Sequence, residues 1–298
     1  MTYVETLGAN AKKAKKVIGT ADTKLKNLCL EEIAVLLEEN TEYILENNRL
    51  DIENGRKNNM ADGLIDRLTL TPERIKGICE AVRKLISLDD PVGVTESGIV
   101  RPNGLNILKT RVPLGVVGII YESRPNVTVD GATLCIKSGN AVILRGGKEA
   151  INSNKALVFV MRKALKKLSL PEDIVQLVED TARETATALM KLDALDVLIP
   201  RGGAGLIKSV VQNATVPVIE TGVGNCHIYV ESSADFDMAL DILENAKTSR
   251  VSVCNAAESL LVDKSIASKF LPLAKKRLDK SNVQWYGCEE TLKYVPMH

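Results

Sequence analysis

Apolar residues recur at helical spacing through the first ninety residues. Between Thr23 and about Glu46, leucine, isoleucine and cysteine residues form one stripe at steps of three and four. The segment from Glu5 to Ile18 is rich in alanine and lysine and contains no proline. Another helix is predicted from Thr71-Pro72-Glu73 to Asp89-Asp90-Pro91, because threonine caps helices and proline suits the first turn. The N-terminal part is therefore predicted to be helical.

Short apolar runs alternate with helical stretches after residue 115. Val116 to Ile120 is continuously apolar, as in a strand that is buried on both faces. Further strands are predicted at 141–144, 175–178, 197–199 and 216–219, with helices at 127–137, 149–168, 183–191 and 204–212. This alternation predicts an α/β fold with a parallel sheet covered by helices. A hairpin is predicted before the sheet, since residues 99–113 alternate around Pro102-Asn103-Gly104.

Glycine-rich and polar loops follow the predicted strands. They span residues 121–126, 145–148, 200–203 and 220–225. Ligands of parallel sheets collect at the carboxyl ends of the strands, so these loops predict a nucleotide-binding face. The GxGxxG fingerprint is absent from the sequence, and an ordinary Rossmann phosphate turn is not implied.

Composition and charge exclude several classes of function. The 298 residues suit one large domain or two medium ones. A balance of 39 basic against 38 acidic residues disfavours a nucleic-acid binder, and two histidines disfavour a catalytic zinc site. No apolar stretch approaches the ~18 residues that span a membrane, and no signal peptide is visible. Six cysteines without a CxxC pair indicate reduced thiols in a cytoplasmic protein.

Cys254 is the candidate nucleophile. It lies in Ser252-Val253-Cys254-Asn255-Ala256, between a helix predicted from Asp237 to about Thr248 and a strand predicted at Ser259–Val262. A thiol at such a junction can be exposed in a cleft, where its thiolate attacks acyl carbons. The alternative is a buried structural thiol, as predicted for Cys29 and Cys135 on their apolar stripes. We expect Cys254 to be the one thiol that reacts at neutral pH.

Two glycine pairs are candidates for cofactor binding. In Arg145-Gly146-Gly147-Lys148, two cations flank mobile backbone, which suits a phosphate such as the 2′-phosphate of NADP. Gly202-Gly203 opens a helix whose N–H groups could face a pyrophosphate. The alternative for Gly146-Gly147 is a solvated turn, and the alternative for Gly202-Gly203 is a tight turn.

Other polar residues have equally open roles. Asn126 follows Arg124-Pro125 at a strand-to-helix turn, where it would donate to an oxyanion or cap the helix. Glu220, before Thr221-Gly222, is a candidate base or cofactor ligand, or one half of an ion pair. Arg250 would receive an anionic leaving group or lie on the surface.

Four stretches resemble the aldehyde dehydrogenase superfamily, and within it the branch that reduces γ-glutamyl phosphate in proline biosynthesis. They are Val112–Ala150 with GIIYESRPNVTVDGATLCIKSGNAVILRGGKEA, Leu195–Lys208, Val216–Val230 and Asn245–Val262 with RVSVCNAAESLLV. The resemblance runs over essentially the whole chain. It implies a Rossmann-like NADP-binding domain over residues 1–230 and the N-terminal part of an α/β catalytic domain over 231–298. The hairpin near 97–114 would then serve oligomerisation.

The resemblance also implies a reaction. Cys254 matches the nucleophile, which would attack L-glutamyl 5-phosphate and expel phosphate to leave a thioacyl enzyme that NADPH reduces to L-glutamate 5-semialdehyde. The backbone N–H of Cys254 and the Asn126 side chain would hold the oxyanion. Arg145 falls where the superfamily has a lysine against the adenosine ribose. Glu220 falls where hydrolytic members keep a general base, a role that a reductase does not need.

The resemblance implies further residues for the remaining contacts. Arg124 and Arg250 are expected to hold the substrate phosphate. The cofactor would meet Arg145, Gly146, Gly147, Lys148, Gly202, Gly203, Glu220 and Gly222.

Members of this branch continue beyond the point where this sequence stops, so we expect a C-terminally truncated chain. The strand at 259–262 would then lack partners, and nucleotide binding should survive better than catalysis. A full-length chain is expected to form a homo-oligomer and to associate with glutamate 5-kinase. Two alternatives stay open: an impaired fragment that still binds the nucleotide, and an acylating aldehyde dehydrogenase that uses coenzyme A.

Overall fold

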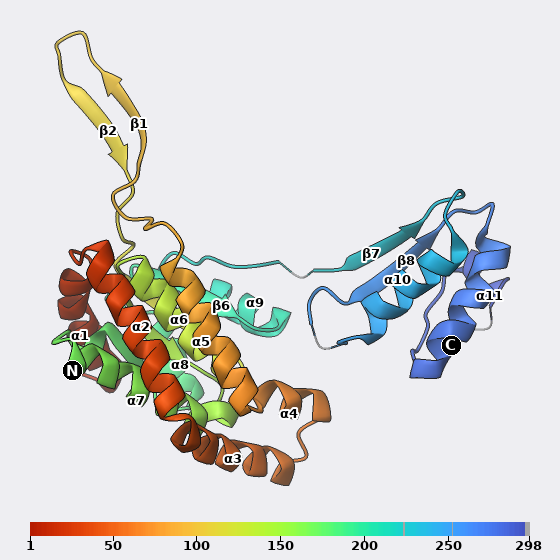
Figure 1. The fold of residues 1–298 in the computed structure, drawn as a ribbon, viewed down its shortest axis with the longest axis horizontal. Coiled ribbons are helices and arrows are strands. Elements are labelled where there is room, and N and C mark those ends of the chain that lie inside the picture. The colour runs from red at the N-terminus through yellow and green to blue at the C-terminus, as the bar shows by residue number, and fades with distance from the viewer. Residues whose placement is uncertain (223, 252, 296–298) are drawn as a thin grey trace. The chain divides into compact units, whose positions relative to one another are not determined.

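The structure is a computed structural model that describes residues 1–222, 224–251 and 253–295. The chain divides into two compact units, Met1–Thr221 and Gly222–His298, called unit 1 and unit 2 below (Figure 1). The sequence placed this boundary after residue 230. The boundary lies earlier because β7 (Cys226–Val230) pairs in parallel with β8 (Ala257–Val262) and thereby belongs to unit 2.

Unit 1 opens with a group of helices. They are α1 (Tyr3–Ile18), α2 (Thr23–Glu39), α3 (Thr41–Lys57), α4 (Asp62–Leu68) and α5 (Pro72–Ile86). The prediction of one helix up to Glu46 is wrong, because the chain breaks at Asn40. The Asn40 side chain donates to the carbonyl oxygen of Leu36 at 2.7 Å, a local bond that competes with helix continuation. The predicted start of α5 is confirmed: Thr71 Oγ1 accepts from the N–H of Arg74 at 3.2 Å.

A parallel sheet forms the centre of unit 1, with the strand order β5-β4-β3-β6. Its strands are β3 (Val116–Tyr121), β4 (Ala141–Arg145), β5 (Val175–Leu177) and β6 (Val197–Arg201). The crossovers carry α6 (Pro125–Lys137), η1 (Lys148–Ala150), α7 (Ile151–Lys167), η2 (Glu172–Ile174) and α8 (Arg183–Met190), and α9 (Ala204–Asn213) follows β6. The predicted parallel sheet is confirmed. The strand predicted at 216–219 is reduced to a bridge between Leu198 and Val218.

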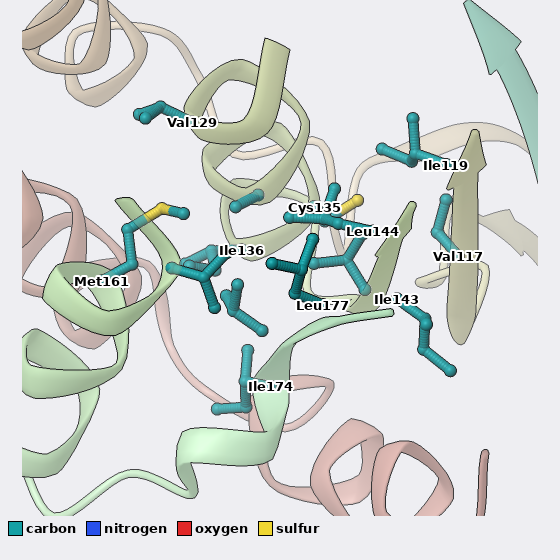
Figure 2. Packing of buried hydrophobic residues seen from close by; sticks show 14 of the residues in the cluster. Val117, Ile119, Val129, Cys135, Ile136, Ile143, Leu144, Met161, Ile174 and Leu177 are labelled. Atoms are coloured by element: carbon teal, nitrogen blue, oxygen red, sulfur yellow. The ribbon is translucent and has the colours of Figure 1, made fainter. Parts of the chain in front are cut away.

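The core of unit 1 lies between the sheet and the helices that cover it. Figure 2 shows Ile143 and Leu144 of β4 together with Ile136 of α6 and Met161 of α7. All four side chains are completely buried. Burial of this kind stabilises the sheet by roughly 2 kcal/mol per large aliphatic side chain and fixes the strand ends from which the loops emerge.

The predicted hairpin is confirmed as β1 (Thr95–Val100) paired with β2 (Asn106–Thr110). Gly104 adopts a φ of +83° in its loop, a conformation that suits glycine. Figure 1 shows the hairpin standing away from the rest of unit 1. Every residue in both strands is exposed, including apolar ones such as Val100 and Leu108.

Unit 2 packs two helices against the β7–β8 pair. They are α10 (Phe236–Thr248) and α11 (Ala267–Leu278), and η3 (Asp279–Ser281) and α12 (Glu289–Leu292) follow. Phe236 and Phe270 meet edge to face with their ring centroids 5.3 Å apart. Strand β7 was not predicted as a strand, whereas α10 and β8 lie close to their predicted positions. Within the described residues, the helices are all too short or too polar to cross a membrane.

Candidate functional site

The loops after β3 and β4 line one pocket in unit 1, with a volume of about 780 Å³. The carboxyl ends of parallel strands share one edge of the sheet, which brings Glu122–Arg124 close to Gly147–Glu149. The remaining lining residues are Leu64, Arg67, Tyr121, Arg145, Thr181, Ala182, Arg183 and Leu206. The pocket is therefore rich in cationic side chains, with two acidic ones among them.

Arg145 combines burial with unused hydrogen-bonding capacity. One of its terminal nitrogens donates to the carbonyl oxygen of Thr181 at 3.1 Å. Its Nε is buried and has no hydrogen-bond partner among the described residues. Burial lowers the pKa of this guanidinium, and the negative charges of Glu149 and Asp180 act in the opposite direction. The Arg145 guanidinium can bind an anionic ligand with a small further desolvation free energy, because folding has already removed much of its water.

Close packing surrounds the two glycines after Arg145, most tightly at Gly146, whose neighbours are the buried side chains of Asn154 and Tyr121. A Cβ on Gly146 would lie 2.2 Å from Asn154 Nδ2, and one on Gly147 would lie 2.7 Å from Glu149 Oε2. The backbone at Gly147 also approaches Ser123, since that added Cβ would lie 3.3 Å from the Ser123 nitrogen. Lys148 is exposed at the rim of the pocket. The loop is thereby held against β3 with its cations beside the pocket.

Cys254 is exposed in the turn that precedes β8. The alternative of a buried structural thiol is therefore wrong for this residue. Cys226, at the start of β7, donates its thiol hydrogen to the carbonyl oxygen of Cys254 at 3.3 Å. The buried thiols of unit 1 behave differently, because burial raises the pKa of Cys29 to about 12 and that of Cys79 to about 11.

Comparisons with known proteins agree with this layout. Residues 2–297 match the model of the aldehyde dehydrogenase family. The gamma-glutamyl phosphate reductase of Clostridium perfringens is 57% identical over 289 residues, which are 97% of this chain and 70% of that protein. The enzyme of the same name from Carboxydothermus hydrogenoformans is 54% identical, over 99% of this chain and 72% of its own length.

The chain belongs to the aldehyde dehydrogenase family, among the gamma-glutamyl phosphate reductases. The crystal structure of the Thermotoga maritima gamma-glutamyl phosphate reductase superposes with a TM-score of 0.91 at 46% identity, covering 99% of this chain and 72% of that one. An acetylating aldehyde dehydrogenase from Geobacillus thermoglucosidasius shares the fold, with a TM-score of 0.68 at 20% identity. The predicted superfamily and its α/β fold are confirmed.

Within this family member, Asn126 lies in the first turn of α6 and is exposed. Its Nδ2 donates to Asp130 Oδ2 at 3.1 Å. The alternative that Asn126 caps the helix is wrong, because Arg124 takes the cap position and makes no side-chain cap bond. Burial raises the pKa of Asp130, and the bond from Asn126 opposes that effect. The oxyanion role of Asn126 stays a prediction.

Sequence reasoning missed Glu122, which lines the pocket at the end of β3. Its Oε1 accepts from the N–H of Gly203 at 3.0 Å. A carboxylate thus occupies the first turn of α9, where the sequence left a pyrophosphate or a tight turn as alternatives. Gly202 is held close to the same group, since an added Cβ would lie 2.7 Å from the Glu122 carboxyl carbon. The position of Glu122 directly after a buried strand was the available signal.

The remaining predicted residues lie apart from the unit 1 pocket or in unit 2. Glu220 is exposed and makes no ion pair within the described part of the chain, so the ion-pair alternative is wrong. Gly222 begins unit 2, and a Cβ there would meet open space. Arg250 is exposed shortly after α10, and it engages in an interaction of its own. Val223 and Ser252, which complete two of the predicted segments, lie outside the described residues.

Proposed function

We propose that this chain reduces L-glutamyl 5-phosphate to L-glutamate 5-semialdehyde and phosphate, with NADPH as the reductant. The observation that carries the proposal is the 57% identity, over 97% of the chain, to an enzyme named gamma-glutamyl phosphate reductase. The exposed thiol of Cys254 supports it, because acyl transfer needs an accessible nucleophile. An oxidoreductase of proline biosynthesis is the resulting assignment.

The chemistry rests on the Cys254 sulfur. Its thiolate attacks the acyl carbon, the bond from that carbon to the phosphate oxygen breaks, and inorganic phosphate leaves. When bound, the nicotinamide cofactor would supply the hydride that reduces the resulting thioester. The carbon–sulfur bond then breaks, the aldehyde leaves, and the thiol regains its proton. We assign the side chain of Asn126 and the N–H of Cys254 to the oxyanion that forms at each step.

We place the cofactor phosphates at the unit 1 pocket. The unsatisfied Nε of Arg145 and the exposed Lys148 fit an added phosphate, and the glycines between them let the backbone approach it. These two cations are the basis for NADP over NAD. Glu122 at the first turn of α9 argues against a pyrophosphate seated there without movement of that side chain.

We assign the substrate phosphate to Arg124 and Arg250. Arg124 lines the same pocket as Arg145, so a role toward the cofactor is also open to it. Arg250 lies in unit 2, as Cys254 does, four positions before it in the sequence. An arginine suits this task because its planar guanidinium binds phosphate oxygens in pairs.

We further propose a cytoplasmic homo-oligomer that associates with glutamate 5-kinase. The hairpin supports the oligomer, because Val100 is 69% exposed and Leu108 is 57% exposed in a pair of strands whose residues are all exposed. Charged substitutions at these two positions should lower the mass measured by light scattering. An unchanged mass would place the contact elsewhere.

The deciding experiment measures NADP⁺ reduction with glutamate 5-semialdehyde and phosphate. NADPH binding is measured by fluorescence on the same preparation, with the Thermotoga maritima protein as control. Phosphate-dependent turnover that Cys254→Ala abolishes supports the proposed reaction. Turnover that needs coenzyme A in place of phosphate would indicate the acylating alternative, and binding without turnover would indicate the non-catalytic one.

A further inference from the structure

The six cysteines fall into two sets with different surroundings. Cys29, Cys79 and Cys135 are buried in unit 1. Cys226, Cys254 and Cys288 lie in unit 2, where Cys226 is partly buried and the other two are exposed. Oxidants reach thiols that are accessible, so any thiol redox chemistry of the native protein concerns unit 2.

Two of the unit 2 thiols come from segments that touch. Cys226 is the first residue of β7, and it pairs with Ala257, the first residue of β8. Cys254 precedes Ala257 by three positions, so its turn lies beside the start of β7. The approach is close: a Cβ on Gly224 would lie 3.6 Å from the Cys254 carbonyl oxygen.

The Cys226 sulfur contacts the backbone of Cys254. Cys226 Sγ lies 3.3 Å from the carbonyl oxygen of Cys254. A carbonyl oxygen lies about 2.4 Å from its own Cα, which places Cys226 Sγ at most about 5.7 Å from Cys254 Cα. The Cys226 sulfur lies about 2.8 Å from its own Cα, so the two Cα atoms are at most about 8.5 Å apart. Disulfide-bonded residues have their Cα atoms about 4.4–6.8 Å apart, so the pair either lies in this range or reaches it through a movement of the exposed Cys254 turn.

We propose that Cys226 is the resolving thiol of Cys254, and that the two form a reversible disulfide when peroxide oxidises Cys254. The inference rests on the proposed function in one respect, the assignment of Cys254 as the nucleophile. Nothing in that function requires Cys226. The pair would convert an oxidised nucleophile into a form that thiols can restore.

The chemistry balances with hydrogen peroxide as the oxidant. The Cys254 thiolate attacks one peroxide oxygen, the O–O bond breaks, and a sulfenic acid and water result after proton uptake. The Cys226 sulfur then attacks the Cys254 sulfur, and the S–O bond breaks. Hydroxide leaves, combines with the proton from Cys226 and forms a second water. The two thiols lose two electrons in total, and the peroxide gains them. A dithiol reductant reverses the change through a mixed disulfide.

Cys288 provides the matched comparison. It is an exposed thiol in the same unit, and its sulfur lies 3.2 Å from Thr291 Oγ1. Its contact with Thr291 lowers the pKa of the thiol, which favours oxidation of Cys288 itself. Within the described residues of unit 2, no hydrogen bond joins Cys288 to Cys226 or Cys254. If thiol reactivity decides which cysteine forms a disulfide with Cys254, that cysteine is Cys288. If proximity decides, it is Cys226.

The test treats the full chain with hydrogen peroxide in excess over the protein, blocks the remaining thiols with iodoacetamide and analyses non-reduced peptides by mass spectrometry. We expect a linked Cys226–Cys254 peptide pair that dithiothreitol removes. Cys226→Ser should yield no linked pair, and its Cys254 should proceed to sulfinic acid that dithiothreitol does not reverse. Cys288→Ser should behave as the unaltered protein does. A thermal melt of each variant checks that it folds. Cys226→Ala is a second variant at this position and should give the same result as Cys226→Ser.

The peptide readout separates this inference from the proposed function. A linked Cys226–Cys254 pair in a protein without reductase activity would support the disulfide and count against the function. Full reductase activity with no linked pair would support the function and count against the disulfide. A Cys254–Cys288 link, or equal sulfinic acid formation with and without Cys226, would overturn the inference.

Discussion

The 2′-phosphate that distinguishes NADP from NAD requires cationic partners, and Arg145 and Lys148 are the pair that the sequence placed beside Gly146 and Gly147. Arg145 is held by Thr181, a residue that no local pattern connects with it. The residue types of the pocket could therefore be predicted, whereas the contacts that orient them depend on the tertiary fold. Glu122 shows the same limit, because its partner Gly203 is distant in sequence.

Replacing both cations tests the cofactor preference. Arg145→Ala with Lys148→Ala should weaken NADPH binding roughly tenfold or more, because each charged hydrogen bond contributes about 1.5–3 kcal/mol. NADH binding should change much less, since NADH has no 2′-phosphate. Fluorescence titration of both cofactors provides the measurement, with Lys13→Ala, an exposed residue of α1, as the control. Equal losses for NADPH and NADH would contradict the assignment.

The pH dependence of alkylation tests the thiol assignments. The sequence singled out Cys254 as the one reactive thiol, and the structure adds Cys288, whose pKa is lowered by Thr291. The thiolate is the reactive form, so Cys288 should label at a lower pH than an ordinary thiol with a pKa of 9.0. Cys29, with a pKa raised to about 12, should stay unlabelled in the folded protein. Peptide mapping after iodoacetamide treatment between pH 6 and 9 measures the labelling of each cysteine. Rapid labelling of Cys29 would contradict the assignment of Cys29 as a buried, unreactive thiol.

At the scale of elements, the continuous apolar runs that became β3 and β4 were recognisable because both faces of each strand are buried. Strand β7 was not, because its residues alternate between partly buried and exposed and its partner β8 lies far along the chain. The break between α2 and α3 was missed because the apolar stripe continues across Asn40. Periodicity therefore identifies buried elements well and misses short edge strands and local breaks.

The start of α7 depends on a residue from another helix. Asp51 of α3 is 2% exposed, and its carboxylate accepts from the backbone N–H groups of Asn152 and Ser153 and from both of their side chains. It thereby caps a helix that begins directly after η1 and the glycine loop of the pocket. Asn48 joins the same network through Ser153 Oγ at 2.9 Å.

Asp51→Ala should therefore lower the free energy of unfolding by about 3 kcal/mol, because it leaves several buried donors without an acceptor. Asp22→Ala is the matched control, since Asp22 caps α2 from an exposed site through Leu25. That loss should be about 1 kcal/mol. Urea denaturation followed by circular dichroism measures both. Similar losses for the two variants would show that burial and cross-helix contact add nothing at Asp51.

At the scale of the whole molecule, the two units differ in the amount of core that supports them. The unit 1 core joins its parallel sheet to α1, α2, α5, α6 and α7. Among the described residues, the main core of unit 2 holds six that are buried: Val230, Leu240, Leu243, Phe270, Ala274 and Leu278. Within the described residues its sheet has two strands, β7 and β8. The pocket assigned to the cofactor lies within unit 1, and the nucleophile lies within unit 2.

We expect the units to unfold in separate steps, with unit 2 unfolding first, because stability grows with the apolar surface that a unit buries. The single tryptophan of the chain, Trp285, packs against the core of unit 2 and therefore reports on that unit. In urea without cofactor, its fluorescence should change at a lower concentration than most of the helical circular dichroism signal, which comes largely from unit 1. Turnover should follow the tryptophan transition, and NADPH binding should follow the later one. NADPH should move only the later transition to higher urea, because a ligand stabilises the unit that binds it. Coincident fluorescence and circular dichroism transitions that NADPH shifts together would show one cooperative unit and contradict this division of stability.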